Sequence, residues 1–383
     1  MKEIYIIGES IITALGENLA DNMQRISRLE SGVIMQNNPN ISHIALPIAS
    51  IDWKSLEDKF IQLHLNQDYT AFEKLMILSA HEAIQHAGVD TKSKRTIFVI
   101  STTKGNIELL KPELAKNHDS SRIHLWSAAE AISKYFENPN EAIVISNACV
   151  SGVMAASFGA ELLRSDEYDH AVVIGGDILS QFVVSGFQSF QSLSSEICKP
   201  YDLNRNGLNL GEAAGCIILS NVKTSDIQIL AGASHNDANH ISGPSRTAEG
   251  MFYAVQDALK YSKISAAQID AISAHGTATP YNDEMEAIGL DRLGMTDVPI
   301  HSLKGFWGHT LGAAGIIEII ALIWSMRHDK ILPTMGFSEL GVSKNIQVSK
   351  EVSSKKIQFG LKIASGFSGI NSALILKKEG GRL

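Results

Sequence analysis

The stretch SAHEAIQHAGVDTKSKRTIFVIS (79–101) has a second version, YAVQDALKYSKISAAQIDAIS (253–273), in the later part of the chain. Each is typical of a helix, a short loop and a strand rich in β-branched residues. In both places a strand, a small-residue loop and a helix follow, in AIVISNACVSGVMAASFGAELL (142–163) and VPIHSLKGFWGHTLGAAGIIEIIAL (298–322). The repetition predicts that the chain consists of two similar halves.

A third element completes each half. Both halves close with a glycine-rich turn that runs into a strand, GEAAGCIILS (211–220) and GFSGINSALILK (366–377). The strand candidates of the whole chain are residues 95–101, 141–146, 170–176, 215–220, 269–274, 298–302 and 372–377. Several are apolar on both faces, as central strands covered by helices are. The order of elements therefore predicts an α/β protein, and the repeat is far too long for a solenoid.

The composition excludes several classes of protein. Of the 383 residues, 44% are hydrophobic and 19% are charged, which is enough apolar material for a large core and excludes disordered and fibrous chains. There are 33 Lys and Arg residues against 41 Asp and Glu, which gives a net charge of −8. Because there is no run of basic residues, we expect neither nucleic acid nor an anionic membrane as a partner.

The sequence also indicates a cellular compartment. Three cysteines with no CxxC spacing indicate neither a disulfide scaffold nor a structural zinc site, and they suit a reducing compartment. Glu3 and Glu9 lie where a signal peptide would need an unbroken apolar stretch. The most apolar stretch, residues 316–326, contains Glu318 and is too short to span a bilayer. We therefore expect a cytoplasmic protein.

Cys149 is the first candidate for chemistry. It directly follows an apolar strand and precedes a predicted helix, so its sulfur should lie near unpaired backbone N–H groups and the positive end of the helix dipole. Both favour the thiolate, which is the nucleophilic form. The small neighbours Ala148, Ser151 and Gly152 leave room for a substrate carbonyl. The alternative is a buried structural cysteine, which is the interpretation we give to Cys216 in mid-strand.

Two histidines take similar positions. His275, in SAHGTATPYND, and His309, in LKGFWGHTLGAAGIIE, each lie just beyond a strand. Because the carboxyl ends of strands in α/β sheets are where loops converge into sites, one thiol and two imidazoles there suggest thiol-dependent acyl transfer. Metal binding is the competing interpretation, but no HxH, HExxH or CxxC spacing supports it. We predict no metal.

Two further residues could support such a site. Lys304 precedes His309 by five residues in a glycine-punctuated loop, where it could fix an imidazole or a carboxyl group; the alternative is a solvated lysine. Phe367 lies in the Gly/Ser turn ASGFSGIN (364–371). Backbone N–H groups of such a turn can complete an oxyanion hole, and the ring can act as a gate. The alternative is a flexible loop anchored by its phenylalanine.

Four blocks of the sequence resemble the signature blocks of the condensing β-ketoacyl synthases, in the family's order and at about its spacings. They are NACVSG (147–152), AHGTATPYND (274–283), KGFWGHTLGAAG (304–315) and GFSGIN (366–371). The set is similar to the elongating type, with Cys-His-His, rather than the initiating type, in which asparagine replaces the second histidine. The resemblance covers nearly the whole chain. It implies a thiolase-like fold of two duplicated α/β halves in a layered α-β-α-β-α arrangement, here 1–225 with the cysteine and 226–383 with the two histidines.

The resemblance also implies an activity, that of an acyltransferase of the 3-oxoacyl-[acyl carrier protein] synthase kind, in a type II fatty acid, aryl-polyene or polyketide pathway. Cys149 would accept an acyl chain from an acyl carrier protein, and its backbone N–H and that of Phe367 would hold the thioester oxyanion. His275 and His309 would stabilise the enolate-like charge that forms as a malonyl thioester loses carbon dioxide. The carbanion would then attack the Cys149 thioester in a decarboxylative Claisen condensation.

Supporting residues and partners follow from the same resemblance. Lys304 and Glu318 match the positions that order the second histidine and its loop, and a charge such as Glu318 on an apolar helix needs a partner. Thr277 and Thr279 match the two hydroxyls that bond the pantetheine arm. The implied partners are an acyl carrier protein and a second subunit, in a homodimer or in a heterodimer with a related ketosynthase-like chain. No organic cofactor is implied.

Two alternative functions remain to be weighed, and two of the motifs differ from the family's usual residues. A chain-length-factor-like partner subunit of a heterodimeric ketosynthase usually lacks the cysteine, whereas Cys149 is present here. A thiolase would carry a second cysteine near the carboxyl terminus, and this chain has none there. In the ASGFSG block, Ser365 stands where the family usually has an aromatic residue and Ser368 where it usually has glycine, so we expect the gate around Phe367 to move differently. Ala278 stands at a common glycine position of the HGTAT block, which is a mild change.

Overall fold

Ten strands form one continuous ladder in the computed structural model, which describes residues 2–63, 68–240 and 243–380. Their order is β10-β9-β13-β14-β8-β1-β7-β6-β4-β5. In chain order they are β1 (Ile4–Thr13), β4 (Thr96–Ser101), β5 (Ile143–Ile145), β6 (His170–Asp177), β7 (Ala213–Ser220), β8 (Ile227–Asn236), β9 (Ala271–Ser273), β10 (Ile300–His301), β13 (Phe359–Ser365) and β14 (Ile370–Lys378).

The ladder consists of two sheets with the same topology. β5-β4-β6-β7-β1 is matched position by position by β10-β9-β13-β14-β8, and corresponding strands follow in the same chain order in both. The two sheets meet at only two residue pairs, where β1 pairs with β8: Ile4 with Ile229 and Tyr5 with Gln228. The predicted duplication is therefore confirmed in the topology. The boundaries 1–225 and 226–383 stay a prediction.

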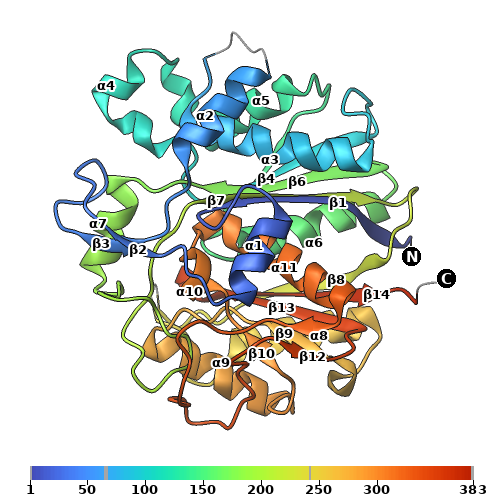
Figure 1. Cartoon of the computed structure of the whole chain (residues 1–383). Coiled ribbons are helices and arrows are strands. Elements are labelled where there is room, and N and C mark those ends of the chain that lie inside the picture. The colour runs from blue at the N-terminus through green and yellow to red at the C-terminus, as the bar shows by residue number, and fades with distance from the viewer. Residues whose placement is uncertain (1, 64–67, 241–242, 381–383) are drawn as a thin grey trace.

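Helices cover both sheets in five layers (Figure 1). The helices α2 (Trp53–Gln62), α3 (Ala71–Ala87) and α5 (Leu125–Tyr135) lie on the outer side of the first sheet, and α8 (Glu249–Ser262) and α9 (Pro280–Arg292) on that of the second. Between the sheets lie α6 (Ser151–Arg164) and α11 (Ala314–His328), one from each half. This is the α-β-α-β-α arrangement that the resemblance implies, and the thiolase-like fold is confirmed.

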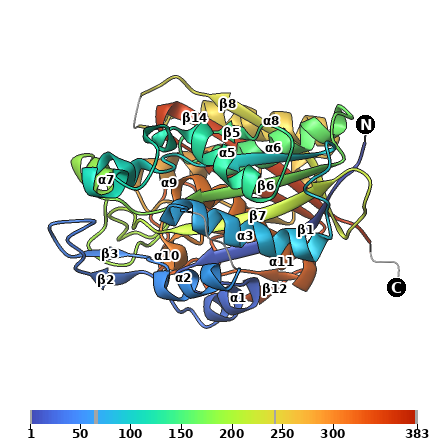
Figure 2. The same ribbon diagram turned by 90° about the horizontal axis from the view of Figure 1, so that it is seen from above.

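The remaining helices and strands are short and lie outside the ten-stranded ladder and its main helices. They are α1 (Leu19–Ser27), β2 (Ile34–Gln36), β3 (Leu46–Ile48), η1 (Ile107–Leu110), α4 (Pro112–Ala115), η2 (Ser120–Ile123), α7 (Gln181–Ser189), η3 (Ala266–Gln268), α10 (Lys304–Trp307), η4 (Leu311–Ala313), β11 (Lys330–Ile331), β12 (Ser353–Ser354) and η5 (Phe367–Gly369). Seen from the front and from above, the β2–β3 hairpin and α7 lie at one end of the molecule and both termini at the other (Figures 1 and 2).

The seven strand candidates all correspond to observed strands, but β1, β8 and β13 were not among the predictions. β1 carries Glu9 in its middle, and that residue pairs with Arg327 of α11. β8, IQILAGASHN (227–236), is interrupted by polar and small residues, and β13, FGLKIAS (359–365), by small residues and a lysine, so neither has the apolar run that marks the other strands. Cross-strand pairing and burial, rather than local pattern, place these three.

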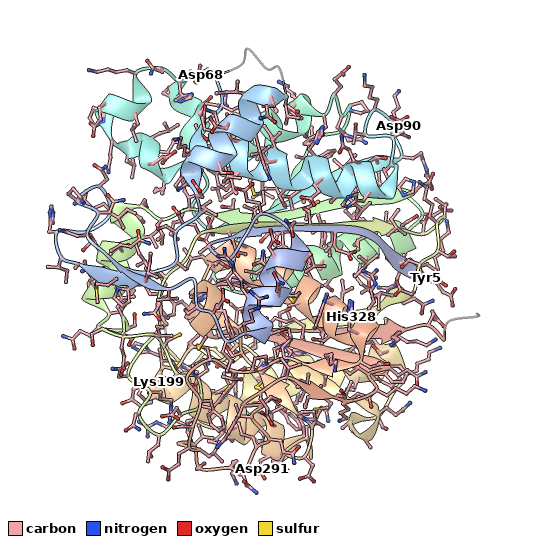
Figure 3. All side chains as sticks on the ribbon, in the orientation of Figure 1. Tyr5, Asp68, Asp90, Lys199, Asp291 and His328 are labelled. Carbon is pink, nitrogen blue, oxygen red and sulfur yellow. The ribbon has the colours of Figure 1, made fainter. Side chains whose placement is uncertain are left out.

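The apolar side chains gather in separate cores between the layers, and charged side chains such as those of Asp68, Asp90 and Asp291 lie at the periphery (Figure 3). The continuous helical stretch Leu311–His328 is long and apolar enough to cross a membrane, contrary to our estimate of its length, but 83% of it is buried inside the protein. It belongs to the core between the sheets, which explains its composition.

The two central helices touch through glycine. A Cβ on Gly152 of α6 would lie 2.8 Å from the backbone nitrogen of Ile316, and one on Gly315 would lie 2.4 Å from that of Val153. The small residues in both strand–loop–helix repeats therefore allow the start of α6 and the start of α11 to approach at backbone distance. This contact holds Cys149 of one half beside His309 of the other.

We predict that Gly315→Ala lowers the thermal unfolding midpoint, because overpacking a core costs about 1–3 kcal/mol. The matched control is Gly186→Ala in α7, where an added Cβ meets no described atom within 4 Å and removes a helix-weakening glycine. Its midpoint should stay the same or rise. Differential scanning fluorimetry of both variants checks this, and an unchanged midpoint in Gly315→Ala would contradict the close contact.

Candidate active site

Cys149 lies in the turn between β5 and α6. The preceding residue, Ala148, has a left-handed backbone with φ +47°, which is costly for a residue with a Cβ. The Ser151 hydroxyl donates to the Ala148 carbonyl (2.6 Å) and accepts from the Asn147 N–H (2.8 Å). These bonds close the turn, which aims a thiol that is only 7% exposed into the pocket.

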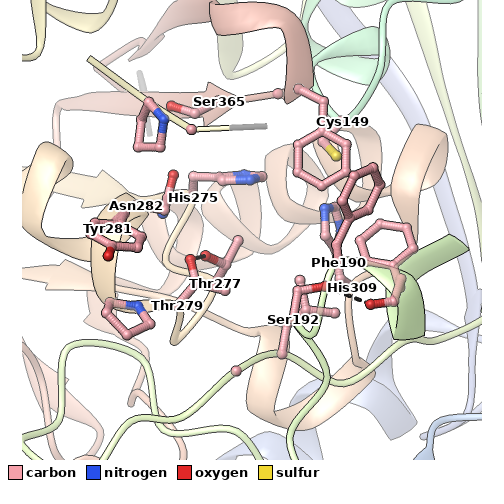
Figure 4. Close-up of a pocket in the computed structure, with 18 of the residues that line it drawn as sticks. Cys149, Phe190, Ser192, His275, Thr277, Thr279, Tyr281, Asn282, His309 and Ser365 are labelled. Atoms are coloured by element: carbon pink, nitrogen blue, oxygen red, sulfur yellow. Dashed lines mark hydrogen bonds between the residues drawn. The ribbon is translucent and has the colours of Figure 1, made fainter. Parts of the chain in front are cut away.

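Both predicted histidines reach the same place. His275 follows β9, and His309 lies between α10 and η4. The Cys149 sulfur and ring nitrogens of both histidines lie within 4.8 Å of one another, and the two rings meet edge to face at 5.4 Å. In Figure 4, His275 points across the pocket towards Cys149 and His309. A thiol and two imidazoles at this spacing could also hold a metal ion, so the predicted absence of a metal stays a prediction.

His309 is held in one tautomer. The Leu311 N–H donates to its Nδ1 (3.3 Å), so the proton of the neutral ring lies on Nε2. Burial and the positive charge of Lys304 together lower the pKa of His309 to about 3. Within the described residues Nε2 has no hydrogen-bond partner although it is buried. His309 therefore presents an unused N–H donor beside the thiol.

His275 is also neutral. Burial lowers its pKa well below the ordinary value, and Lys304 and His309 add to the effect. Its Nδ1 has no partner in the described part of the chain, so no hydrogen bond fixes its tautomer. One ring can therefore only donate in its resting form, whereas the other can donate or accept a proton.

The expectation of a resting thiolate is wrong. Burial raises the pKa of Cys149 to about 11, although the charges of Lys304 and Lys104 and the backbone N–H of Phe367 act to lower it. Desolvation of the charged sulfur outweighs the stabilisation by these groups. The resting site is a neutral thiol beside two neutral imidazoles.

A buried ion network supports the histidines. Glu318 of α11 binds Lys304 through Oε1 (2.7 Å) and Lys362 of β13 through Oε2 (2.6 Å), and all three side chains are almost fully buried. Lys304 also donates to the His275 carbonyl (2.6 Å). Lys304 is therefore a buried residue and not a solvated loop lysine, and Glu318 has the partner that its position requires.

The loop of His275 is held by an acidic pair. Glu286 accepts hydrogen bonds from the backbone N–H groups of His275 and Gly276, both at 2.7 Å. Asp283 accepts from the Thr277 N–H (3.0 Å). Both carboxylates come from α9 and point at the turn, so they act on its backbone rather than in the pocket.

Thr277 and Thr279 line the pocket opposite Cys149 and bond each other through their hydroxyls (2.8 Å; Figure 4). Phe367 faces the thiol with its backbone N–H. Its ring stacks on Phe187 at 5.7 Å and meets Phe190 edge to face at 5.3 Å. The pocket that these residues line has a volume of about 560 Å³.

Sequence reasoning missed three contributors. Lys362 lies inside an apolar strand, and the argument that identified Glu318 as a buried charge would have found it. Asp177 ends β6 and accepts from the Gly312 N–H (2.7 Å) and the Thr103 N–H (2.9 Å), so it ties two site loops together. A carboxylate at a strand end is the signal that was available. No sequence pattern indicated Phe190, because a single aromatic residue after a predicted helix is usually an exposed surface residue.

Two sequence profiles match the chain. The profile described as "Beta-ketoacyl synthase, N-terminal domain" matches residues 1–225, and "Beta-ketoacyl synthase, C-terminal domain" matches residues 228–338. The chain belongs to the β-ketoacyl synthase family. The family resemblance of the four motifs is thereby confirmed.

Named members of the family are similar over most or all of the chain. The putative mitochondrial 3-oxoacyl-[acyl-carrier-protein] synthase of Schizosaccharomyces pombe is 26% identical, over 99% of both chains. The 3-oxoacyl-[acyl-carrier-protein] synthase 2 of Rhizobium meliloti is 30% identical, over 68% of this chain and 65% of its own. Among solved structures, the ketosynthase ApeO in complex with its chain length factor ApeC, from Xenorhabdus doucetiae, has a TM-score of 0.87 at 23% identity, covering 99% of this chain and 98% of that one.

We predict that alkylation of Cys149 by iodoacetamide accelerates about tenfold for each pH unit between 7 and 9, because a thiol with a pKa near 11 gains thiolate over this whole range. Intact-protein mass spectrometry measures the rate, with Cys149→Ala as the control. An alkylation rate that stops rising below pH 8 would contradict this prediction and show that Cys149 is a thiolate in the resting protein.

We predict that Glu318→Gln lowers the free energy of unfolding by about 3–5 kcal/mol at pH 7, because two buried lysines lose their counter-charge. Burial raises the pKa of Glu318, but Lys304 and Lys362 outweigh it and hold the pKa below the ordinary value of 4.5. The contribution of Glu318 is therefore complete above that value and is lost as the pH falls through the lowered pKa.

Urea unfolding of both proteins between pH 7 and pH 3 measures this difference. It should stay constant down to about pH 4.5 and shrink below that value, because Glu318 titrates there and glutamine does not. A difference that grows as the pH falls would contradict the ion network.

Proposed function

We propose that the chain is a 3-oxoacyl-[acyl carrier protein] synthase that joins an acyl group on Cys149 to a decarboxylated malonyl thioester. One observation carries the proposal: a thiol and two neutral imidazoles meet within 4.8 Å in a pocket, and the His309 Nε2–H has no acceptor among the described residues. Neutral N–H donors aimed at one point suit a reaction in which negative charge develops there. The names of the relatives support the same activity.

The first step is acyl transfer. The Cys149 sulfur attacks the thioester carbonyl of an acyl carrier protein, a new C–S bond forms, and the bond to the pantetheine sulfur breaks. The thiol proton passes to that leaving sulfur, so charge is conserved. The backbone N–H groups of Cys149 and Phe367 are the proposed donors to the oxyanion. Because the thiol is neutral at rest, deprotonation belongs to this step and not to the free enzyme.

The second step is decarboxylation and condensation. The malonyl carboxylate leaves as carbon dioxide, and its bonding electrons pass to the thioester oxygen, where His275 and His309 donate hydrogen bonds. Each such donor is worth about 3–4 kcal/mol when removed from comparable sites. The carbanion then attacks the Cys149 thioester, the new C–C bond forms, and the bond to the Cys149 sulfur breaks. The sulfur leaves as a thiolate and takes up one proton from solvent, which balances the proton lost with the pantetheine sulfur in the first step. The product is a 3-oxoacyl thioester.

Other residues have proposed positioning roles. Lys304 fixes the His275 loop through its carbonyl, and Glu318 fixes Lys304. Thr277 and Thr279 would bond the pantetheine arm, since their hydroxyls line the pocket. The two halves, 1–225 and 226–383, would supply the nucleophile and the donors respectively.

The pathway and partners are finer proposals. We infer a type II pathway with a separate acyl carrier protein, of the fatty acid, polyketide or aryl-polyene kind. The likeness to the ketosynthase ApeO with its chain length factor and to the ishigamide ketosynthase/chain length factor, at TM-scores of 0.87, supports a heterodimer with a related chain. A homodimer stays the alternative. A cytoplasmic location and the absence of a cofactor stay predictions.

The second candidate function is a chain-length-factor-like partner subunit without catalysis. The same titles favour it, because chains of this fold occur in such pairs. The complete set of Cys149, His275 and His309 argues against it, since a partner without catalysis needs none of them.

We predict that Cys149 gains the mass of an acyl group when the protein is mixed with a panel of acyl carrier protein thioesters, and that Cys149→Ala gains none. His275→Ala and His309→Ala should keep at least part of this loading but lose condensation by about 100-fold or more. Intact-protein mass spectrometry measures loading, and release of carbon dioxide from malonyl carrier protein measures decarboxylation.

Two outcomes would contradict the proposal. If both histidine variants condense at the wild-type rate, the mechanism is wrong. If no primer loads, also in the presence of a related ketosynthase, the partner-subunit function takes its place.

A further inference from the structure

The loop that follows β13 covers the thiol. A Cβ on Gly366 would lie 3.2 Å from the backbone nitrogen of Cys149 and 3.2 Å from the Ala148 Cβ, so the loop backbone lies against the cysteine turn. Cys149 is accordingly only 7% exposed although it lines a pocket of about 560 Å³. The reactivity of Cys149 therefore depends on how firmly this loop is held.

One side of the loop is held by hydrogen bonds. The Asn236 side chain donates to the Ser368 carbonyl (2.8 Å), and the Asp237 N–H donates to the Gly369 carbonyl (2.9 Å). Ser368 has φ +71°, a left-handed conformation that costs a serine more than it would cost a glycine. These contacts anchor the backbone on the side of β8.

The other side is held by apolar packing, in which Phe367 lies against the buried cluster around α7 and contacts two aromatic rings. Phe367 stacks on Phe187 with an interplanar angle of 26°, and Phe190 meets it edge to face at 67°. Phe187 is buried in α7, but Phe190 is the residue after that helix and remains 51% exposed. In Figure 4, Phe190 lies on the same side of the pocket as Cys149 and His309.

Phe190 is thus a large apolar side chain that is half exposed to water at the pocket wall and makes an edge-to-face contact with the Phe367 ring. Burial alone does not explain its position, because much of its surface gains nothing from it. An edge-to-face contact between rings is directional and adds stabilisation beyond the buried area. That contact acts on the side of Phe367 that no hydrogen bond described above restrains.

We propose that Phe190 is a positioning residue that holds Phe367 over Cys149 and so sets how fast a reagent or an acyl group reaches the thiol. It acts through Phe367 and does not take part in bond making. The claim about acyl groups rests on the proposed function, whereas the claim about access to the thiol does not. Opening the loop breaks the contact of Phe367 with Phe190, and closing it restores that contact.

The test measures alkylation of Cys149 at pH 8 by iodoacetamide and by a bulky aromatic maleimide, with intact-protein mass spectrometry. Phe190→Ala should raise the rate about two- to tenfold, which is the size of one aromatic pair, and more for the bulky reagent. Phe190→Tyr should restore the wild-type rate, because it keeps the ring edge. Cys149→Ala identifies labelling elsewhere, which should be slow because Cys198 and Cys216 are fully buried.

The matched control is Phe182→Ala. Phe182 lies on the same helix with 57% exposure, but it is not among the described residues that line the pocket. It should leave the rate unchanged. Equal rates in wild type and Phe190→Ala, or equal acceleration in Phe190→Ala and Phe182→Ala, would overturn the proposal.

Acyl loading separates this inference from the proposed function. If Phe190→Ala accelerates alkylation and no variant accepts an acyl group, the inference about access stands and the synthase function fails. If all variants load acyl groups and alkylation does not respond to Phe190, the function stands and the inference fails.

Discussion

One carboxylate holds the site together. Glu318 is buried in the helix that runs between the two sheets, and it neutralises Lys304 and Lys362, which in turn bind the carbonyls of Ser273, Ala274 and His275. Taking three charges out of water is costly, and only good geometry repays it. Because two lysines face one carboxylate, an excess of positive charge remains beside the imidazoles. Burial is the main cause that lowers the pKa of both histidines, and this positive charge is the second. Both rings therefore stay neutral hydrogen-bond donors.

The same buried environment keeps the Cys149 thiol protonated and therefore unreactive at rest. A site dry enough to strengthen hydrogen bonds to a developing oxyanion is also dry enough to keep Cys149 protonated. In the proposed mechanism, the N–H groups at the helix start therefore act on the oxyanion, and they do not keep the resting thiol ionised. Such a resting thiol also resists adventitious oxidation, since the thiolate is the reactive form.

Most of this architecture could be predicted from the sequence, because it depends on patterns of residues that are close together in the chain. Strand–loop–helix repeats gave the duplication, and the positions just beyond strands gave Cys149, His275 and His309. What failed were properties that depend on distant parts of the chain. β1 owes its central place to its neighbours in the sheet, Lys362 is explained only by Glu318, and the charge state of Cys149 follows from burial that no local motif records. The contact of Phe190 with Phe367 joins residues far apart in sequence, so no pattern could reveal it.

The matched topology has a consequence for how such a site can arise. The turn that carries Cys149 and the turn that carries His309 occupy the same place in the two halves, between corresponding strands and the two central helices that meet at Gly152 and Gly315. A symmetric pair of identical chains would present the same side chain from both turns, two thiols or two imidazoles. Joining the copies in one polypeptide frees each turn to mutate alone, and here one turn carries a thiol and the other an imidazole. The two halves thus carry different side chains at the site while their strands keep the same order.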